Sequence, residues 1–257
     1  MKVELVDWTG KGTGDPWYAA ALLIWAKNTR VMMTESSFEE IRKWPPNKLW
    51  NELEYVVNTL PASWEHVDFV FLLTGVTRAF THQLVRTRTA SYSQQAMQIG
   101  VKLDWEYHTG MTIKNNAEAM AIYDDCMIQI AEAYQELMKI PGVHPEDARG
   151  ILPTNILTNI VMKANLRTMC DLLRKRASPR NQGARPGDEG EWAVCHREMK
   201  SRMIEALPWC DMFLNRDADK YAADAYLLLE QIPDKKLRTD VTKRIDAILT
   251  NVGSGSQ

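Results

Sequence analysis

The amino-acid sequence predicts an α+β fold in which a central sheet is flanked by helices. Residues 1–7 alternate apolar and polar side chains, as a half-buried strand does. Residues 66–76, HVDFVFLLTGV, are rich in β-branched and aromatic side chains and too short for a typical buried helix. Residues 117–139, by contrast, repeat apolar side chains at helical spacing. The 257 residues can bury a substantial core as one domain.

The first third of the chain is expected to be mostly helical and carries no obvious chemistry. A helix is predicted over residues 16–27. Two serines precede a second helix at residues 38–44, two prolines end it, and another helix begins near Asn47.

The strand at residues 66–76 is expected to be central and to end at Gly75. A helix should follow over residues 77–86. Its apolar side chains can face the core: Ala79, Phe80 and Leu84. Polar side chains gather on another face: Arg78, His82, Gln83 and Arg86. That second face directs its polar groups toward one place.

The helix at residues 117–139 ends at Pro141-Gly142, and its apolar faces suit packing in a bundle or at an interface. A short helix is predicted over residues 145–152, and a strand over residues 156–162. Asn165 then occupies the position of an N-cap, before the helix LRTMCDLLRKR.

Residues 178–190 are dense in Pro and Gly and should form a loop. Helices are predicted over residues 191–206, from Lys220 to the region before Pro233, and from there to about Leu249. We therefore expect one domain over residues 1–250, with a helical C-terminal extension, and a flexible tail over residues 251–257.

The charge balance argues against a nucleic-acid or membrane-surface protein. Lys+Arg 31 against Asp+Glu 33 gives a net charge of -2, and the pI is about 6.2. No segment has the length or character of a signal peptide or a membrane span, so we expect a soluble, cytoplasmic protein, in the host cytoplasm if the chain is viral. Four widely spaced cysteines favour reduced, mostly buried thiols over a metal site or disulfides: Cys126, Cys170, Cys195 and Cys210.

Polar groups concentrate in residues 81–100, THQLVRTRTASYSQQAMQIG. Arg86 and Arg88 leave the predicted helix and enter a run of hydroxyl and amide side chains: Ser91, Tyr92, Ser93, Gln94, Gln95 and Gln98. Two guanidiniums followed by so many uncharged hydrogen-bonding groups suit an anionic, heteroaromatic ligand. The plain alternative is a solvated helix end, whose C-terminal dipole favours cations.

A second group of polar residues lies downstream: Arg149, Asn165, Arg167, Asp171, Arg174 and Arg176. Local pairing explains several of them, because Arg167 and Asp171 are i,i+4 partners and Asp171 and Arg174 are i,i+3 partners. Alone, these residues do not imply catalysis.

Together, the two groups resemble the flavin-dependent thymidylate synthase family in order and nearly in spacing. That family carries the signature RHRxxSxNxxSxR, and residues 86–98, RTRTASYSQQAMQ, match both arginines and Ser91. The resemblance extends to Glu65-His66 and Gln83 upstream. Downstream it includes ARGILP around Arg149, the Asn165-Leu166-Arg167 triplet and Arg176. It covers roughly residues 64–176 and resumes weakly at Glu191-Trp192.

This resemblance implies the family's fold, with an antiparallel sheet, and its reaction. The family methylates C5 of dUMP with carbon from methylenetetrahydrofolate and a hydride from reduced FAD, which NADPH regenerates. Family members are homotetramers. The expected partners are therefore a pyrimidine deoxynucleotide, a folate and further copies of the chain, without nucleic acid, membrane or metal.

By the same resemblance, Arg176 is the expected catalytic residue, because a fixed cation beside the pyrimidine stabilises negative charge as C5 becomes nucleophilic. Substrate binding is expected of Gln83, Arg86, Gln95, Ala96, Gln98, Arg149 and Arg176. Flavin binding is expected of Arg86, Thr87, Arg88, Ser93, Gln94, Asn165, Arg167 and Asp171.

Four positions depart from the signature: Thr87 replaces histidine, Ser93 asparagine, Ala96 the second serine, and Gln98 the final arginine. Weaker contacts to the nucleotide phosphate should cost about 1–3 kcal/mol of binding unless another cation substitutes. The candidate substitutes are Arg78, Arg180 and Arg185. These departures suggest a variant reaction, such as 5-hydroxymethylation or the use of dCMP.

Two other functions are compatible with the sequence. A degenerate homologue would bind nucleotide or flavin without catalysis, in a regulatory or structural role. An RNA-binding module would use Arg86, Arg88 and Tyr92, but the charge balance offers no basic surface for it.

Overall fold

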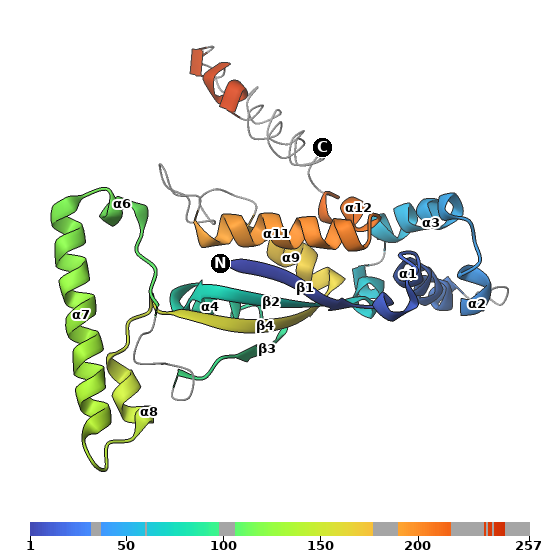
Figure 1. Cartoon of the computed structure of the whole chain (residues 1–257). Coiled ribbons are helices and arrows are strands. Elements are labelled where there is room, and N and C mark those ends of the chain that lie inside the picture. The colour runs from blue at the N-terminus through green and yellow to red at the C-terminus, as the bar shows by residue number, and fades with distance from the viewer. Residues whose placement is uncertain are drawn as a thin grey trace. The chain divides into compact units, whose positions relative to one another are not determined.

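The computed structural model describes residues 1–31, 37–59, 61–97, 106–176, 190–216, 234, 236–237 and 239–244 (Figure 1). The chain divides into two compact units, Met1–Cys210 and Asp211–Gln257. The predicted helix from Lys220 to the region before Pro233, the tail and almost all of the 178–190 loop lie outside the described residues. The final predicted helix is described only in part, and residues 236–237 and 239–244 are helical there. One domain over residues 1–250 therefore stays a prediction. Within the described residues, no helix is long and apolar enough to cross a membrane.

In the described part of the chain, four strands form one antiparallel sheet in the order β1-β2-β4-β3. Their bounds are Lys2–Trp8 for β1, Asp68–Thr77 for β2, Ser91–Gln94 for β3 and Leu157–Asn165 for β4. The predicted α+β class is confirmed, as are the strands near residues 1–7, 66–76 and 156–162. Strand β3 was not predicted, because SYSQ has no apolar alternation.

One face of the sheet forms the core. Along β2 the side chains of Phe69, Phe71 and Leu73 are fully buried, and β4 contributes Ile160 and Met162 to the same layer. The intervening residues of β4 lie on the opposite face, where they are exposed: Asn159, Val161 and Lys163. This alternation follows the two-residue period of a strand.

Gly75 does not end β2, as the sequence had suggested. The strand continues to Thr77 through an irregularity in register between Leu73 and Val76. Gly75 has a φ of 64° there, which glycine adopts without the clash that a Cβ causes. Its N–H donates to Oδ1 of Asn159 at 3.2 Å. The glycine therefore marks a bulge inside the strand.

Three helices form the N-terminal layer: α1 (Tyr18–Asn28), α2 (Phe38–Ile41) and α3 (Pro46–Thr59). Ser37 caps α2 in a capping box with Glu40, in agreement with the prediction. Helix α1 packs on α3, and Lys27 forms an ion pair with Glu52 across them. Short 3-10 turns complete this region at Lys11–Thr13, Thr29–Val31 and Pro61–His66.

Helix α4 (Arg78–Leu84) follows β2 directly. Oγ1 of Thr77 accepts a hydrogen bond from the backbone N–H of Phe80 at 3.0 Å and so caps the helix. Phe80 and Leu84 are buried, as predicted, but Ala79 is exposed. The buried stripe of α4 runs through positions 80, 81 and 84, and this stripe leaves position 79 on the outer side of the helix.

Between β3 and β4, the described residues from Met111 onward form α6 (Met111–Lys114), α7 (Ala117–Lys139), α8 (Pro145–Ala148) and a 3-10 turn at Arg149–Ile151. Helix α7 matches its predicted bounds and is capped by Asn116. Only Met127 and Tyr134 of α7 are buried in the single chain, and Ile122 is 68% exposed.

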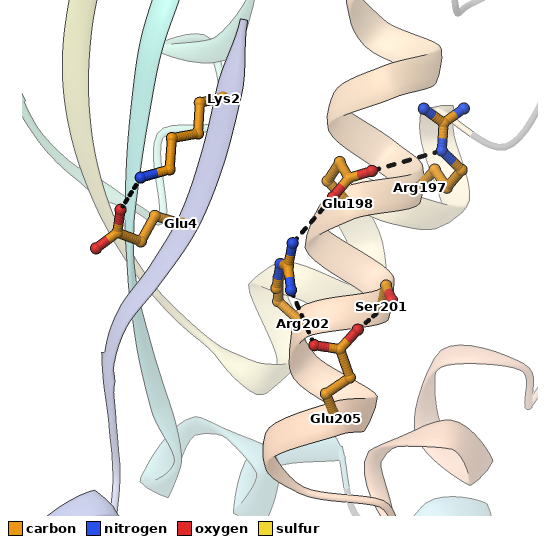
Figure 2. Close-up of polar contacts among 7 residues, drawn as sticks. All are labelled: Lys2, Glu4, Arg197, Glu198, Ser201, Arg202 and Glu205. Atoms are coloured by element: carbon orange, nitrogen blue, oxygen red, sulfur yellow. Dashed lines mark hydrogen bonds and ion pairs between the residues drawn. The ribbon is translucent and has the colours of Figure 1, made fainter.

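Helices α9 (Leu166–Arg176) and α11 (Glu191–Ala206) pack against each other and on the sheet, and α12 spans Cys210–Leu214 (Figure 1). Oδ1 of Asn165 accepts the backbone N–H of Thr168 at 2.9 Å, which confirms the predicted cap. Cys195, Met199 and Met203 of α11 are buried. On its outer side, Arg202 bridges Glu198 and Glu205 (Figure 2). Helix α11 therefore has the amphipathic pattern of a helix that covers a core.

Replacing Gly75 by alanine should lower the free energy of unfolding by about 1–2 kcal/mol, because a Cβ is unfavourable at positive φ. The new Cβ would meet only ordinary contacts, with Met1 backbone atoms at 3.6 and 3.7 Å. The loss of stability would therefore come from the backbone conformation and not from a steric clash. Urea unfolding measures the difference. Gly110→Ala is the matched control, since Gly110 has a φ of -66° and open space around it. Equal stability of the two variants would contradict the assignment of a bulge.

Candidate active site

The side chains of Gln83, Arg176 and Trp192 meet where α4, α9 and α11 come together. Nη1 of Arg176 and Nε1 of Trp192 both donate hydrogen bonds to Oε1 of Gln83, at 3.3 and 3.0 Å. The guanidinium carbon of Arg176 lies 3.8 Å from the centroid of the Trp192 ring, a cation–π contact. The structure thus joins two predicted site residues, Gln83 and Arg176, that are 93 positions apart in the chain.

These two donors fix the orientation of the Gln83 amide. Arginine and tryptophan side chains carry N–H donors and no acceptor, so the atom that faces them must be the amide oxygen. Nε2 of Gln83 makes no hydrogen bond within the described residues. Burial lowers the pKa of Arg176, and nearby Cys195 acts in the opposite direction. The cluster therefore combines a positioned cation with an available N–H donor.

Neighbouring contacts hold this cluster in place. Trp192 is 6% exposed, and its ring packs on Phe80 with centroids 4.5 Å apart. The carboxylate of Glu191 accepts hydrogen bonds from the backbone N–H and the hydroxyl of Thr77, at 2.8 and 2.6 Å. Thr77 caps α4 and Glu191 begins α11, so this pair connects the two helices that carry Gln83 and Trp192.

The chain turns immediately after α4, where Arg86, Thr87 and Arg88 lie. The Tyr92 hydroxyl contacts the carbonyl oxygens of Leu84 and Thr87, at 2.8 and 3.1 Å, and so fixes this turn. Arg86 and Arg88 are exposed, and within the described residues their guanidiniums form no hydrogen bond or ion pair. Tyr92 is half-buried and burial raises the pKa of its hydroxyl, consistent with a structural role.

Strand β3 presents the amide and hydroxyl groups of the signature. Ser93 is exposed, and Nε2 of Gln94 donates to Oγ1 of Thr81 on α4 at 2.8 Å. A shallow hollow of about 250 Å3 lies along this strand and the adjoining β4 and β2, lined by Leu72, Ser93, Gln94, Gln95, Asn159, Ile160 and Val161. Ala96 is exposed beyond it, and Gln98 lies outside the described residues.

Arg149 lies in a 3-10 turn, away from the contacts of the Gln83 cluster. Its Nε donates to the carbonyl of Glu146 at 3.2 Å. Burial of Arg78 and the charge of Arg149 both lower the pKa of Arg78. Arg78 in turn donates through Nη1 to the carbonyl of Gln95 at 3.2 Å. Arg78 therefore contacts Gln95, a predicted substrate-binding residue, and lies within electrostatic range of another, Arg149.

The three remaining predicted flavin-binding residues have partners within the chain. Asn165 caps α9, and Asp171 pairs with Arg174 at 2.6 Å, as the i,i+3 spacing predicted. Arg167 does not pair with Asp171, however. It pairs with Glu65 at 2.8 Å, because the 3-10 turn that carries Glu65 packs against α9. None of the three contacts Gln83, Arg176 or Trp192 through a hydrogen bond in the described structure.

The cysteines lie in helices, as predicted, but only two of the four are buried. Cys195 and Cys210 are buried, Cys170 is half-buried and Cys126 is exposed, and none is in a disulfide. Burial raises the pKa of the Cys195 thiol far above its ordinary value. A raised pKa suppresses the thiolate, so Cys195 is unsuited to nucleophilic attack although it lies near Arg176. Among the described residues, no group of three or more His, Cys, Asp or Glu side chains could hold a metal ion.

Sequence reasoning missed Trp192, Thr77 and Tyr92 as parts of the site. Trp192 joins Gln83 across 109 positions of the chain, a contact that no local pattern encodes. The only signal for it was the weak resemblance at Glu191-Trp192. Tyr92 stood out in the sequence as an aromatic residue of the polar run, but its hydroxyl serves the turn after α4.

Comparison with known proteins identifies the family of the chain. The model of the family described as thymidylate synthase complementing protein matches residues 4–184. The flavin-dependent thymidylate synthase of Pyrococcus furiosus is 29% identical over 212 residues, 80% of this chain and 79% of the relative. Those of Thermococcus onnurineus and Clostridium tetani are each 31% identical. They align over 187 and 198 residues, which span 71% of this chain and 73% and 76% of the relatives. The chain belongs to the thymidylate synthase complementing protein family.

We predict energetic coupling between Gln83 and Trp192. In a double-mutant cycle of Gln83→Leu and Trp192→Phe, the interaction energy for unfolding should be about 0.5–1.5 kcal/mol, the usual contribution of one hydrogen bond. Phenylalanine keeps the ring but loses the N–H donor. Trp209→Phe is the matched control, because the Trp209 indole donates to the carbonyl of Pro16 instead. Strict additivity of the Gln83 and Trp192 variants would refute the shared contact.

Because its pKa is lowered, His196 on α11 should make the free energy of unfolding depend on pH. Burial lowers the pKa of His196 to about 4, aided by Lys200 and opposed by a hydrogen bond with the Leu173 backbone. Between about pH 4 and 6.5 the unfolded chain therefore binds a proton that the folded chain rejects. The free energy of unfolding should fall across that interval as pH decreases, by on the order of 2 kcal/mol from this group.

Urea unfolding between pH 7 and 4.5 measures this effect. His196→Gln should flatten the dependence, whereas His144→Gln, at an exposed position, should preserve it. An unchanged slope in His196→Gln would show that His196 is not buried in its neutral form.

Proposed function

We propose that this protein is a transferase of nucleotide biosynthesis that methylates C5 of dUMP, with carbon from methylenetetrahydrofolate. The observation that carries the proposal is the convergence of Gln83, Arg176 and Trp192 in a chain of this family. Names of the relatives supply the flavin dependence and the thymidylate product. The cluster supplies a physical basis for the activation of a pyrimidine.

Arg176 is assigned the catalytic role. Carbon C5 becomes nucleophilic as negative charge develops on the pyrimidine ring and its carbonyl oxygens, and a cation held beside them lowers the energy of that state. Trp192 stacks on the guanidinium at 3.8 Å and restricts its rotation. A prepositioned charge loses less energy to reorganisation during the reaction than a mobile one.

The orientation of Gln83 favours a uracil ring over a cytosine ring. Its oxygen already accepts two hydrogen bonds, so the group available to a ligand is the Nε2 donor. A donor that faces position 4 of the ring pairs with O4 of uracil but not with the 4-amino group of cytosine. Among the candidate substrates, this polarity supports dUMP before dCMP.

The residues along β3 fit a flavin ring. The hollow beside this strand combines apolar Leu72 and Val161 with the neutral polar groups of Ser93, Gln94 and Asn159, as a heteroaromatic ring requires. When bound, reduced FAD supplies the hydride that completes the methyl group, and NADPH reduces the flavin again. The residues proposed to hold it are Arg86, Thr87, Arg88, Ser93, Gln94, Asn165, Arg167 and Asp171.

For substrate binding we retain Gln83, Arg86, Gln95, Ala96, Gln98, Arg149 and Arg176. The homotetramer and the cytoplasmic location stay predictions. Two other outcomes are kept as alternatives: a 5-hydroxymethyl product, and a homologue that binds nucleotide or flavin without catalysis. The changes at Thr87, Ser93, Ala96 and Gln98 motivate both.

A product assay tests the proposal. Purified protein with FAD, NADPH, methylenetetrahydrofolate and either dUMP or dCMP should form dTMP from dUMP, as identified by mass spectrometry. Arg176→Ala should lower kcat/KM by about 100-fold or more, because it removes the charge that stabilises the activated ring. Arg202→Ala, at an exposed ion pair on α11, should retain wild-type activity.

The alternatives give distinct results in the same assay. Formation of a 5-hydroxymethyl nucleotide, or of a product from dCMP, would show that the protein catalyses a variant reaction instead of dUMP methylation. Nucleotide binding without any product would favour the non-catalytic homologue.

A further inference from the structure

The two exposed arginines Arg86 and Arg88 lie in consecutive turns of the backbone. In the first turn the N–H of Thr87 donates to the carbonyl of Leu84 at 3.0 Å, and in the second the N–H of Ala90 donates to the carbonyl of Thr87 at 3.1 Å. The first turn carries Arg86 and the second carries Arg88. The directions in which the two side chains leave the backbone therefore depend on the geometry of these turns.

One side chain, that of Tyr92 on β3, contacts both turns. Its hydroxyl oxygen lies 2.8 Å from the carbonyl oxygen of Leu84 and 3.1 Å from that of Thr87, the two carbonyls that close the turns. Tyr92 pairs opposite Met162 in the sheet and is half-buried. Burial raises the pKa of the hydroxyl, so it keeps its proton and acts as a donor at neutral pH. Both turns are thus fastened to the sheet through a single hydroxyl group.

A second contact connects the turn of Arg88 to α9. The Oγ1 atoms of Thr168 and Thr89 lie 3.0 Å apart, and Thr168 is buried. The backbone N–H of Thr168 donates to the side chain of Asn165, which caps the same helix. The backbone that carries the two arginines is therefore held both from the sheet and from α9.

These contacts position the backbone but do not engage the guanidiniums. In the part of the chain that the structure describes, neither Arg86 nor Arg88 forms an ion pair or a side-chain hydrogen bond. A fixed backbone with available charges is preorganised for an anion, because less conformational entropy is lost when the ligand binds. The signature RHRxxSxNxxSxR leaves positions 89 and 92 open, so the resemblance assigns no role to Thr89 or Tyr92.

We infer that Tyr92 is a positioning residue for cofactor binding: its hydroxyl holds the two turns so that Arg86 and Arg88 present their charges to the cofactor. This inference rests on the proposed function, because it takes the anionic ligand of the two arginines to be FAD. Tyr92 acts through backbone carbonyls and does not itself touch the ligand.

Tyr92→Phe tests this role, because it keeps the ring and removes only the hydroxyl. The affinity of the full-length protein for FAD, measured by quenching of flavin fluorescence, should fall by about 2- to 10-fold, the usual effect of losing one hydrogen bond. The kcat at saturating FAD should stay at the wild-type value. Tyr107→Phe is the matched control, since the Tyr107 hydroxyl donates to Asp124 at 3.2 Å instead, and it should bind FAD as the wild type does.

A double-mutant cycle separates positioning from a general weakening of the fold. Arg88→Gln removes the charge and keeps a hydrogen-bond donor at that position. If Tyr92 acts through the arginines, Tyr92→Phe should lower FAD affinity by a smaller factor when Arg88→Gln is already present. A merely structural loss would lower the affinity by the same factor in both backgrounds.

The outcomes also separate this inference from the proposed function. Unchanged FAD affinity in Tyr92→Phe would overturn the positioning role, as would an equal loss with and without Arg88→Gln. A wild-type protein that binds FAD and shows the predicted coupling, but forms no methylated product, would support the positioning role and overturn the proposed reaction. A wild-type protein that does not bind FAD would overturn both.

Discussion

One amide oxygen, Oε1 of Gln83, joins the helices around the candidate active site. It accepts hydrogen bonds from Arg176 on α9 and Trp192 on α11, while Gln83 itself belongs to α4. The capped start of α4 is connected to α11 by a second pair, Thr77 with Glu191. Because both donors bind the same acceptor, the position of the cation depends on the indole. The N–H donor that Gln83 offers to a ligand depends on both contacts. The chemistry proposed for the pyrimidine requires this constraint.

Some cations in this part of the molecule are paired with a carboxylate, and Arg78 is bound to a neutral group instead. Ion pairs such as Arg167 with Glu65 lie on exposed surfaces, where each contributes little to stability. Arg78 has a carbonyl partner instead. Neutral partners position a guanidinium without cancelling its charge. A cation held in this way remains able to attract an anionic ligand, even in a chain of net charge -2.

The sequence predicted the helices and strands that have a strong local pattern. It did not predict those that depend on contacts with residues far away in the chain. The apolar run that became β2 and the cap at Asn165 were both evident, since each follows from neighbouring residues. Strand β3 exists because it pairs with β4, with Ser91 opposite Lys163, and SYSQ alone does not encode it. The site was partly predictable: Gln83 and Arg176 were recognised from a motif. Trp192 was not assigned to the site, because packing of α11 brings it there.

The most direct test of the account is a crystal structure of the protein with FAD and dUMP bound. The account predicts a guanidinium nitrogen of Arg176 within about 3.2 Å of a pyrimidine oxygen or of N3, with Trp192 still stacked on the same guanidinium. A pyrimidine bound elsewhere, with Arg176 engaged only by Gln83 and Trp192, would contradict it.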